Sequence, residues 1–147
     1  MNYTSIEQSK KLLELGLSPE SADMIHIYSI IRGKENGFLD AVPKESILYA
    51  VHTTIEEKEK SIPCWSLGAL LDLMPKSIQK YDEGERCYKT YHPNLYQAYY
   101  HCCGYAFGPS LKQENHDMLC SFGDDSWLDV IYKQVVWLLE NGYIKTK

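Results

Sequence analysis

The chain has 147 residues, and 44% of them are hydrophobic, so it can bury a core without disulfides or a metal ion. Its 15 basic and 20 acidic side chains give a net charge of −5, and like charges form no long block. This composition excludes the clustered basic surface of nucleic-acid-binding proteins and the basic amphipathic helix of membrane-surface proteins. We expect a single domain, residues 1–147, with neither nucleic acid nor membrane as a partner.

The beginning of the chain and the cysteines indicate a cellular compartment. The first residues, MNYTSIEQSKK, lack the apolar run of a signal peptide, and no stretch approaches the roughly 18 apolar residues of a membrane span. Five cysteines without a C-x-x-C pair fit reduced thiols better than a disulfide framework. We therefore expect a cytoplasmic protein, and we expect no cofactor.

The first predicted element is a helix over residues 5–15. Thr4 and Glu7 have the spacing of a capping box, and apolar residues recur near one face. Gly16 ends this helix in a Schellman turn, with the following leucine folded back. The next stretch, SPESADM, begins with a cap residue and a proline, which predicts a second, brief helical turn.

Residues 25–61 predict two strands and a connecting segment. Residues 25–31, IHIYSII, are rich in β-branched side chains and predict a strand. Residues 47–53, ILYAVHT, predict a second strand, although Pro43 could equally begin a helix there. Residues 54–61 alternate in charge without an apolar period, which predicts a solvated connector.

The segment IPCWSLGALLDLMP predicts a helix over residues 66–74. Ser66 is the expected N-cap, and Trp65 and Leu70 then have the spacing of a hydrophobic staple. Apolar residues recur at helical intervals up to Pro75, which ends the helix.

From residue 86 to residue 122 the hydrophobic period changes to two. The runs RCYKTYH, LYQAYYHCCGYAF and HDMLCSF, separated by HPN, GP and KQEN, predict an antiparallel meander. Alternation assigns the side chains of the middle strand to two faces. One face carries Tyr99, His101, Cys103 and Tyr105, and the other carries Tyr96, Ala98, Tyr100 and Cys102.

The last predicted element is a helix over residues 125–141. Asp124 or Asp125 is its expected cap, and Gly142 ends it in a second Schellman turn. The elements together predict an α+β fold. A small, mainly antiparallel sheet built from residues 25–31 and 86–122 is packed by about three helices, 5–15, 66–74 and 125–141.

Three blocks of the sequence carry a resemblance to a known family. LLELGLSPESADM, IPCWSLGALLDLMP and VVWLLENGYI, in this order, resemble recurring blocks of a family of small uncharacterised proteins from gut bacteria and their phages. The resemblance covers roughly a third of the chain. It implies a shared compact fold and an origin in mobile DNA, and it implies no activity, cofactor or catalytic residue.

Cys64 invites a hypothesis of catalysis. A cysteine at a helix start, followed by Trp65, is similar to the nucleophile segment of papain-like thiol hydrolases. Such an enzyme would need a histidine, and His101 or His116 would have to serve. We favour the interpretation that Cys64 is a small buried apolar residue, so that the protein has no catalytic residue and is not an enzyme.

A zinc site is a second hypothesis. By alternation, one histidine and one cysteine share a face on each of two strands that are expected to be adjacent. These four side chains would give a zinc ion a tetrahedral set of ligands. They are His101, Cys103, His116 and Cys120. Their spacing matches no established finger, and we favour half-buried structural residues.

The twelve tyrosines support a third hypothesis, a binding surface. Tyrosine combines a large contact area with a polar end and little rotamer entropy. The tyrosines expected at this surface are Tyr96, Tyr99, Tyr100 and Tyr105, within a cluster that also includes Tyr88 and Tyr91. The predicted function is that of a cytoplasmic accessory protein that binds a protein partner or itself, and the alternative is a small thiol hydrolase or zinc-binding protein.

Overall fold

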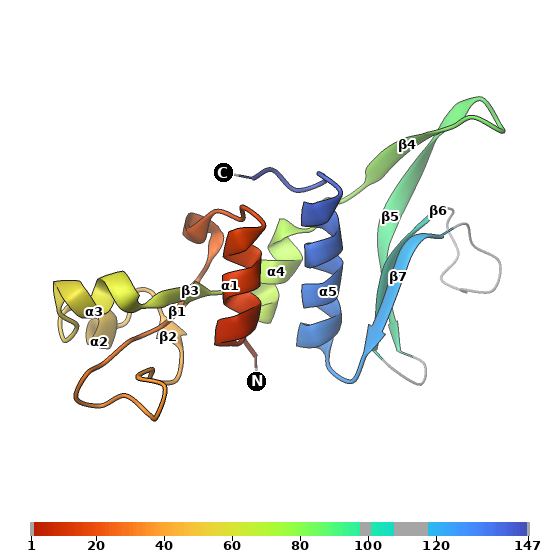
Figure 1. The fold of residues 1–147 in the computed structure, drawn as a ribbon. Helices are drawn as coiled ribbons and strands as arrows, with labels where there is room; N and C mark the ends of the chain where they lie inside the picture. The colour runs from red at the N-terminus through yellow and green to blue at the C-terminus, as the bar shows by residue number, and fades with distance from the viewer. Residues whose placement is uncertain (1, 98–100, 108–117, 147) are drawn as a thin grey trace. The chain divides into compact units, whose positions relative to one another are not determined.

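The computed structural model describes residues 2–97, 101–107 and 118–146. The chain forms two compact units, one made of residues up to Leu70 together with Thr146, the other of Leu71–Lys145. Each unit contains helices and an antiparallel sheet, which confirms the α+β class (Figure 1). The strands form two sheets and not the one sheet predicted, and the single domain stays a prediction. No helix in the described ranges is long and apolar enough to cross a bilayer.

The first helix, α1 (Ile6–Glu14), is confirmed, but its cap lies one residue later than predicted. The Gln8 N–H donates to Ser5 Oγ at 3.1 Å, and the Gln8 side-chain oxygen accepts from the Ser5 N–H at 3.0 Å. These two bonds form a capping box that replaces the predicted Thr4–Glu7 box.

The predicted end of α1 is confirmed. Gly16 has a φ of +92°, and the Leu17 N–H donates to the Leu12 carbonyl at 3.1 Å, as in a Schellman turn. Both leucines are buried. The predicted brief turn follows as a 3-10 helix, Pro19–Ser21, which the Ser18 side chain caps.

The first unit contains a three-stranded antiparallel sheet in the order β2-β1-β3. Its strands are β1 (Met24–His26), β2 (Val42–Pro43) and β3 (Ile62–Cys64). The predicted strand 25–31 is therefore cut short. Gly33 and Ser29 form a turn whose backbone leaves no room for a Cβ at Gly33, and this turn takes the chain out of the sheet.

Two short helices replace the predicted strand 47–53 and the predicted connector 54–61. α2 (Ile47–Ala50) is capped by the Ser46 hydroxyl. α3 (Ile55–Lys60) begins with a capping box between Thr54 and Glu57, with both bonds at 3.1 Å. The other carboxylate oxygen of Glu57 accepts from the Ile30 N–H at 3.0 Å. These donors lower the pKa of Glu57 and tie α3 to the turn after β1.

The helix predicted at 66–74 is α4 (Leu67–Leu73), preceded by the expected cap. The Ala69 N–H donates to Ser66 Oγ at 3.2 Å. Trp65 and Leu70, the predicted staple pair, are both completely buried. The Trp65 indole N–H donates to Ser21 Oγ at 2.9 Å, so this ring also holds the 3-10 turn.

The second unit is a four-stranded antiparallel sheet in the order β4-β5-β6-β7, followed by α5 (Trp127–Glu140). Its strands are β4 (Ile78–Asp82), β5 (Cys87–Gln97), β6 (His101–Phe107) and β7 (Met118–Asp124). The meander is confirmed, but β4 was not predicted. The HPN stretch, predicted as a turn, lies within β5, so the predicted middle strand is divided between β5 and β6.

Helix α5 packs on β6 and β7 through a mostly apolar buried face. Its cap is Ser126, whose hydroxyl accepts from the Asp129 N–H at 3.1 Å, and neither of the two aspartates that were predicted. The predicted Schellman ending is confirmed, since Gly142 has a φ of +77° and the Tyr143 N–H donates to the Leu138 carbonyl at 2.9 Å.

The burial of Trp65 makes a prediction about stability. Trp65→Ala should lower the free energy of unfolding by about 3 kcal/mol or more, because it empties a completely buried site. The measurement is urea denaturation followed by circular dichroism. Trp65→Phe is the matched control, which keeps most of the apolar volume and loses the bond to Ser21 at a cost of about 1 kcal/mol. A loss below about 1 kcal/mol for Trp65→Ala would contradict the buried position.

Candidate functional site

Cys64 is the last residue of β3, and its side chain is completely buried. Burial raises the pKa of its thiol to about 12, and the nearby Asp23 carboxylate adds to the effect. Among the described residues, none forms a hydrogen bond with Cys64 Sγ. A thiol in this environment is protonated at neutral pH, which favours the structural interpretation over that of an activated nucleophile.

The histidines considered as partners of Cys64 have other surroundings. His101 lies in β6, and its ring packs edge-on against Trp127, with 4.7 Å between the ring centroids. His116 lies outside the described residues. The described part of the chain therefore shows no histidine in the position of a base for Cys64, as the thiol-hydrolase hypothesis requires.

The cysteines considered as zinc ligands lie on neighbouring strands. Cys103 Sγ and Cys120 Sγ are 3.7 and 3.6 Å from Gln134 Oε1, and Gln134 is completely buried. Burial raises the pKa of Cys103 to about 12 and also raises the pKa of Cys120. In the described structure both thiols are engaged with the amide of Gln134.

Over the described ranges, no group of three His, Cys, Asp or Glu side chains is arranged to hold a metal ion. The hypothesis of a zinc site needs His116 as a ligand, and that residue lies outside these ranges. The predicted alternation of the strand holds for His101 and Cys103, since both side chains contact residues of α5.

The structure describes two of the four tyrosines of the predicted surface, Tyr96 and Tyr105. Tyr105 is completely buried, and its hydroxyl donates to the Pro75 carbonyl at 2.6 Å, so it does not belong to an exposed surface of this chain. Tyr96 is half-buried. Tyr99 and Tyr100 lie outside the described residues.

A different pair of tyrosines is exposed. Tyr81 in β4 and Tyr88 in β5 are direct cross-strand partners, with 5.1 Å between their ring centroids. Their side chains are 48% and 65% exposed. The prediction missed Tyr81 because it missed β4, although the alternating stretches on either side of the Asp-Glu-Gly sequence are a recognisable hairpin signal.

Side-chain bonds stabilise the turn of this hairpin. Asp82 Oδ1 accepts from the backbone N–H groups of Gly84 and Glu85, at 2.9 and 3.2 Å. The Lys89 ammonium lies 2.9 Å from Asp82 Oδ2 and 3.6 Å from Glu85. The bond from Lys89 lowers the pKa of Asp82, so the carboxylate is charged at neutral pH and holds the two strands in register. The hairpin therefore presents the tyrosine pair on an ordered support.

Comparisons with known proteins are negative. No family model matches the chain, and neither does a curated protein or a solved structure. The resemblance to small proteins of gut bacteria and their phages stays a prediction.

The burial of Cys64 makes a prediction about thiol reactivity. Cys64 should react with iodoacetamide far more slowly than exposed Cys87, which serves as an internal reference within the same chain. A pKa raised from 9.0 to about 12 leaves on the order of 1000-fold less thiolate at pH 8. Peptide mass spectrometry of timed samples measures both rates. Rapid alkylation of Cys64 in the folded protein would contradict the structural role, and denatured protein is the control in which both cysteines should react.

Proposed function

We propose that the protein is a non-enzymatic accessory protein that acts by self-association through β4 and the exposed tyrosine pair. The observation that carries this proposal is the pair itself, because two large aromatic side chains stand exposed as neighbours, Tyr81 on the edge strand β4 and Tyr88 on the adjacent strand β5. Tyrosine is enriched in protein interfaces, where its ring is buried and its hydroxyl finds a partner.

The backbone of β4 supports the proposal. In the described part of the second unit, β4 pairs only with β5, so its other side has no strand neighbour. An open strand edge offers unpaired N–H and C=O groups to a strand from another molecule. Most side chains of β4 are exposed.

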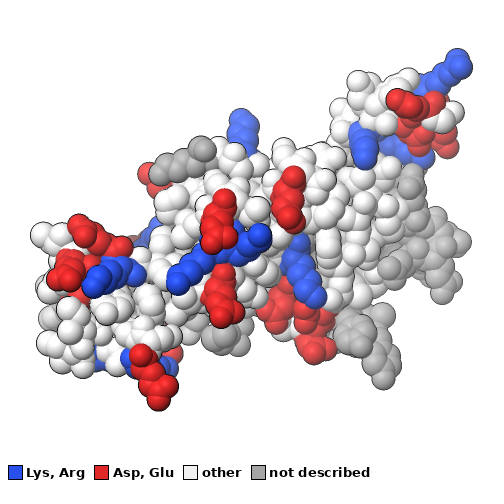
Figure 2. Space-filling view, viewed as in Figure 1, with Lys and Arg blue, Asp and Glu red and all other residues white. Residues whose placement is uncertain are grey.

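The charges of β4 favour a second copy of the chain as the partner. If two β4 strands pair antiparallel with Tyr81 opposite Tyr81, Lys80 of each copy lies opposite Asp82 of the other. This register places two opposite-charge pairs beside the tyrosines. Figure 2 shows both signs of charge gathered at the end of this hairpin. The charged residues of the hairpin are Lys80, Asp82, Glu83, Glu85, Arg86 and Lys89.

The tyrosine pair gives the test of this function. Replacing both residues, Tyr81→Ser with Tyr88→Ser, should raise the dissociation constant of self-association at least about tenfold, because the contact loses its main apolar area. The melting temperature should change little, since a cross-strand pair on the surface contributes below about 1 kcal/mol. Sedimentation velocity over a range of protein concentrations measures the association.

The matched control is Ile47→Ser with Val51→Ser, which removes two exposed apolar side chains from α2 and its end. This variant should associate like the natural chain. Lys80→Glu should weaken association, because it places two carboxylates opposite each other. A natural chain that remains monomeric at all concentrations, or a tyrosine variant that associates normally, would contradict the proposed function.

A further inference from the structure

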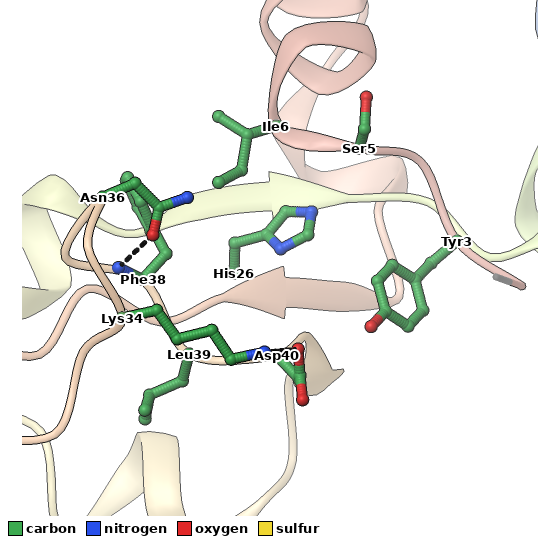
Figure 3. Close-up of a pocket in the computed structure, with 9 residues that line it drawn as sticks. All are labelled: Tyr3, Ser5, Ile6, His26, Lys34, Asn36, Phe38, Leu39 and Asp40. Atoms are coloured by element: carbon green, nitrogen blue, oxygen red, sulfur yellow. Dashed lines mark hydrogen bonds and ion pairs between the residues drawn. The ribbon is translucent and has the colours of Figure 1, made fainter.

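The first unit contains a pocket of about 220 Å³ that the predicted sites do not include. It lies among the start of the chain, β1 and the loop before β2. Figure 3 shows His26 in the middle of the pocket, with the other side chains around it. The lining residues include Tyr3, Ile6, His26, Lys34, Phe38 and Asp40.

The environment of His26 defines its hydrogen-bonding role. The side chain is only 6% exposed, and its Nε2 lies 2.8 Å from the Thr4 carbonyl oxygen. A carbonyl oxygen can only accept, so Nε2 carries the proton. In the neutral imidazole, Nδ1 is then an acceptor, and among the described residues none bonds to it. An acceptor without a protein partner, on a side chain that lines a pocket, is a position for a ligand donor.

Flat and apolar side chains surround this acceptor. The Tyr3 ring packs edge-on against His26, with 5.6 Å between the centroids, and Ile6 and Phe38 line the pocket. At the rim, the Lys34 ammonium and the Asp40 carboxylate form a 2.7 Å ion pair that is mostly exposed. The pair neutralises its own charge, so the pocket does not favour a ligand of either sign.

The same pocket does not have the arrangement of a serine hydrolase, although Ser5, His26 and Asp40 all line it. Ser5 Oγ accepts from the Gln8 N–H as the cap of α1, and His26 Nε2 bonds to Thr4. Asp40 bonds to Lys34. A nucleophile must be within hydrogen-bond reach of its base, and here each group has a different partner. The pocket is therefore suited to binding.

We propose that this pocket binds a small, flat, uncharged aromatic ligand that donates one N–H or O–H to His26 Nδ1. An apolar cavity of about 150 Å³ holds one benzene ring, so a pocket of about 220 Å³ suits a molecule of two fused rings. The apolar side chains of the pocket contact the rings of the ligand, and His26 Nδ1 accepts the hydrogen bond from its N–H or O–H group. This site lies in the first unit and does not depend on association through β4.

The test compares indole with benzofuran, which has the same shape but has an oxygen in place of the N–H. Indole should bind at the pocket at least about tenfold more tightly, because benzofuran leaves the His26 acceptor unpaired. An NMR titration measures both affinities, and the imidazole ¹⁵N signals of His26 report the tautomer and the new hydrogen bond. Equal affinities, absence of indole binding, or a His26 Nδ1 that carries a proton in the free protein would overturn the proposal.

Two variants separate ligand contacts from folding. His26→Gln retains a donor for Thr4 and an acceptor for the ligand, so it should keep the preference for indole. Leu39→Trp fills the pocket without altering the His26–Thr4 bond and should abolish indole binding. Leu13→Trp, at a half-buried leucine of α1 outside the pocket, is the matched control and should bind indole normally. Indole binding that survives Leu39→Trp would place the ligand elsewhere and overturn the proposal.

Discussion

The first unit depends on the hydrogen bonds of one buried residue, Thr4. Its N–H donates to the Trp65 carbonyl at 2.9 Å, its hydroxyl oxygen accepts from the Trp65 N–H at 3.0 Å, and its carbonyl accepts from His26 at 2.8 Å. A buried polar group left unpaired costs about 1–3 kcal/mol, so these bonds are made together or the packing is lost. They join the start of the chain to β1 and to the segment before α4. They also determine which nitrogen of His26 faces the pocket.

In the second unit, the buried amide of Gln134 links a helix to the sheet. Gln134 projects from α5 to two thiols of the sheet, Cys103 and Cys120. Its amide N–H also lies 3.3 Å from Cys120 Sγ, so the amide acts as donor and acceptor toward sulfur. A polar side chain in this position is tolerated because it has partners, and it specifies how the helix lies on the strands.

Several reactive groups among the described residues have structural roles. Cys64 is buried with a raised pKa, and Ser5 caps a helix. His26 is oriented by a backbone carbonyl, and no nucleophile among the described residues is bonded to it. The two proposed contacts use the edge strand β4 with the Tyr81–Tyr88 pair in one unit and the pocket with the His26 acceptor in the other. These features belong to separate units, so the two proposals can be tested separately.

The sequence by itself determined the α+β class, the three main helices and both Schellman endings, because caps and turns act between residues a few positions apart. Tertiary structure decided between alternatives that are locally equivalent. The stretch TSIEQ contains two capping boxes, and Ser5 is the cap because Trp65 engages Thr4. The exposure of the tyrosines and the pocket around His26 required the structure, since both depend on pairing between segments distant in sequence. Such pairing depends on burial and backbone geometry that no local pattern contains.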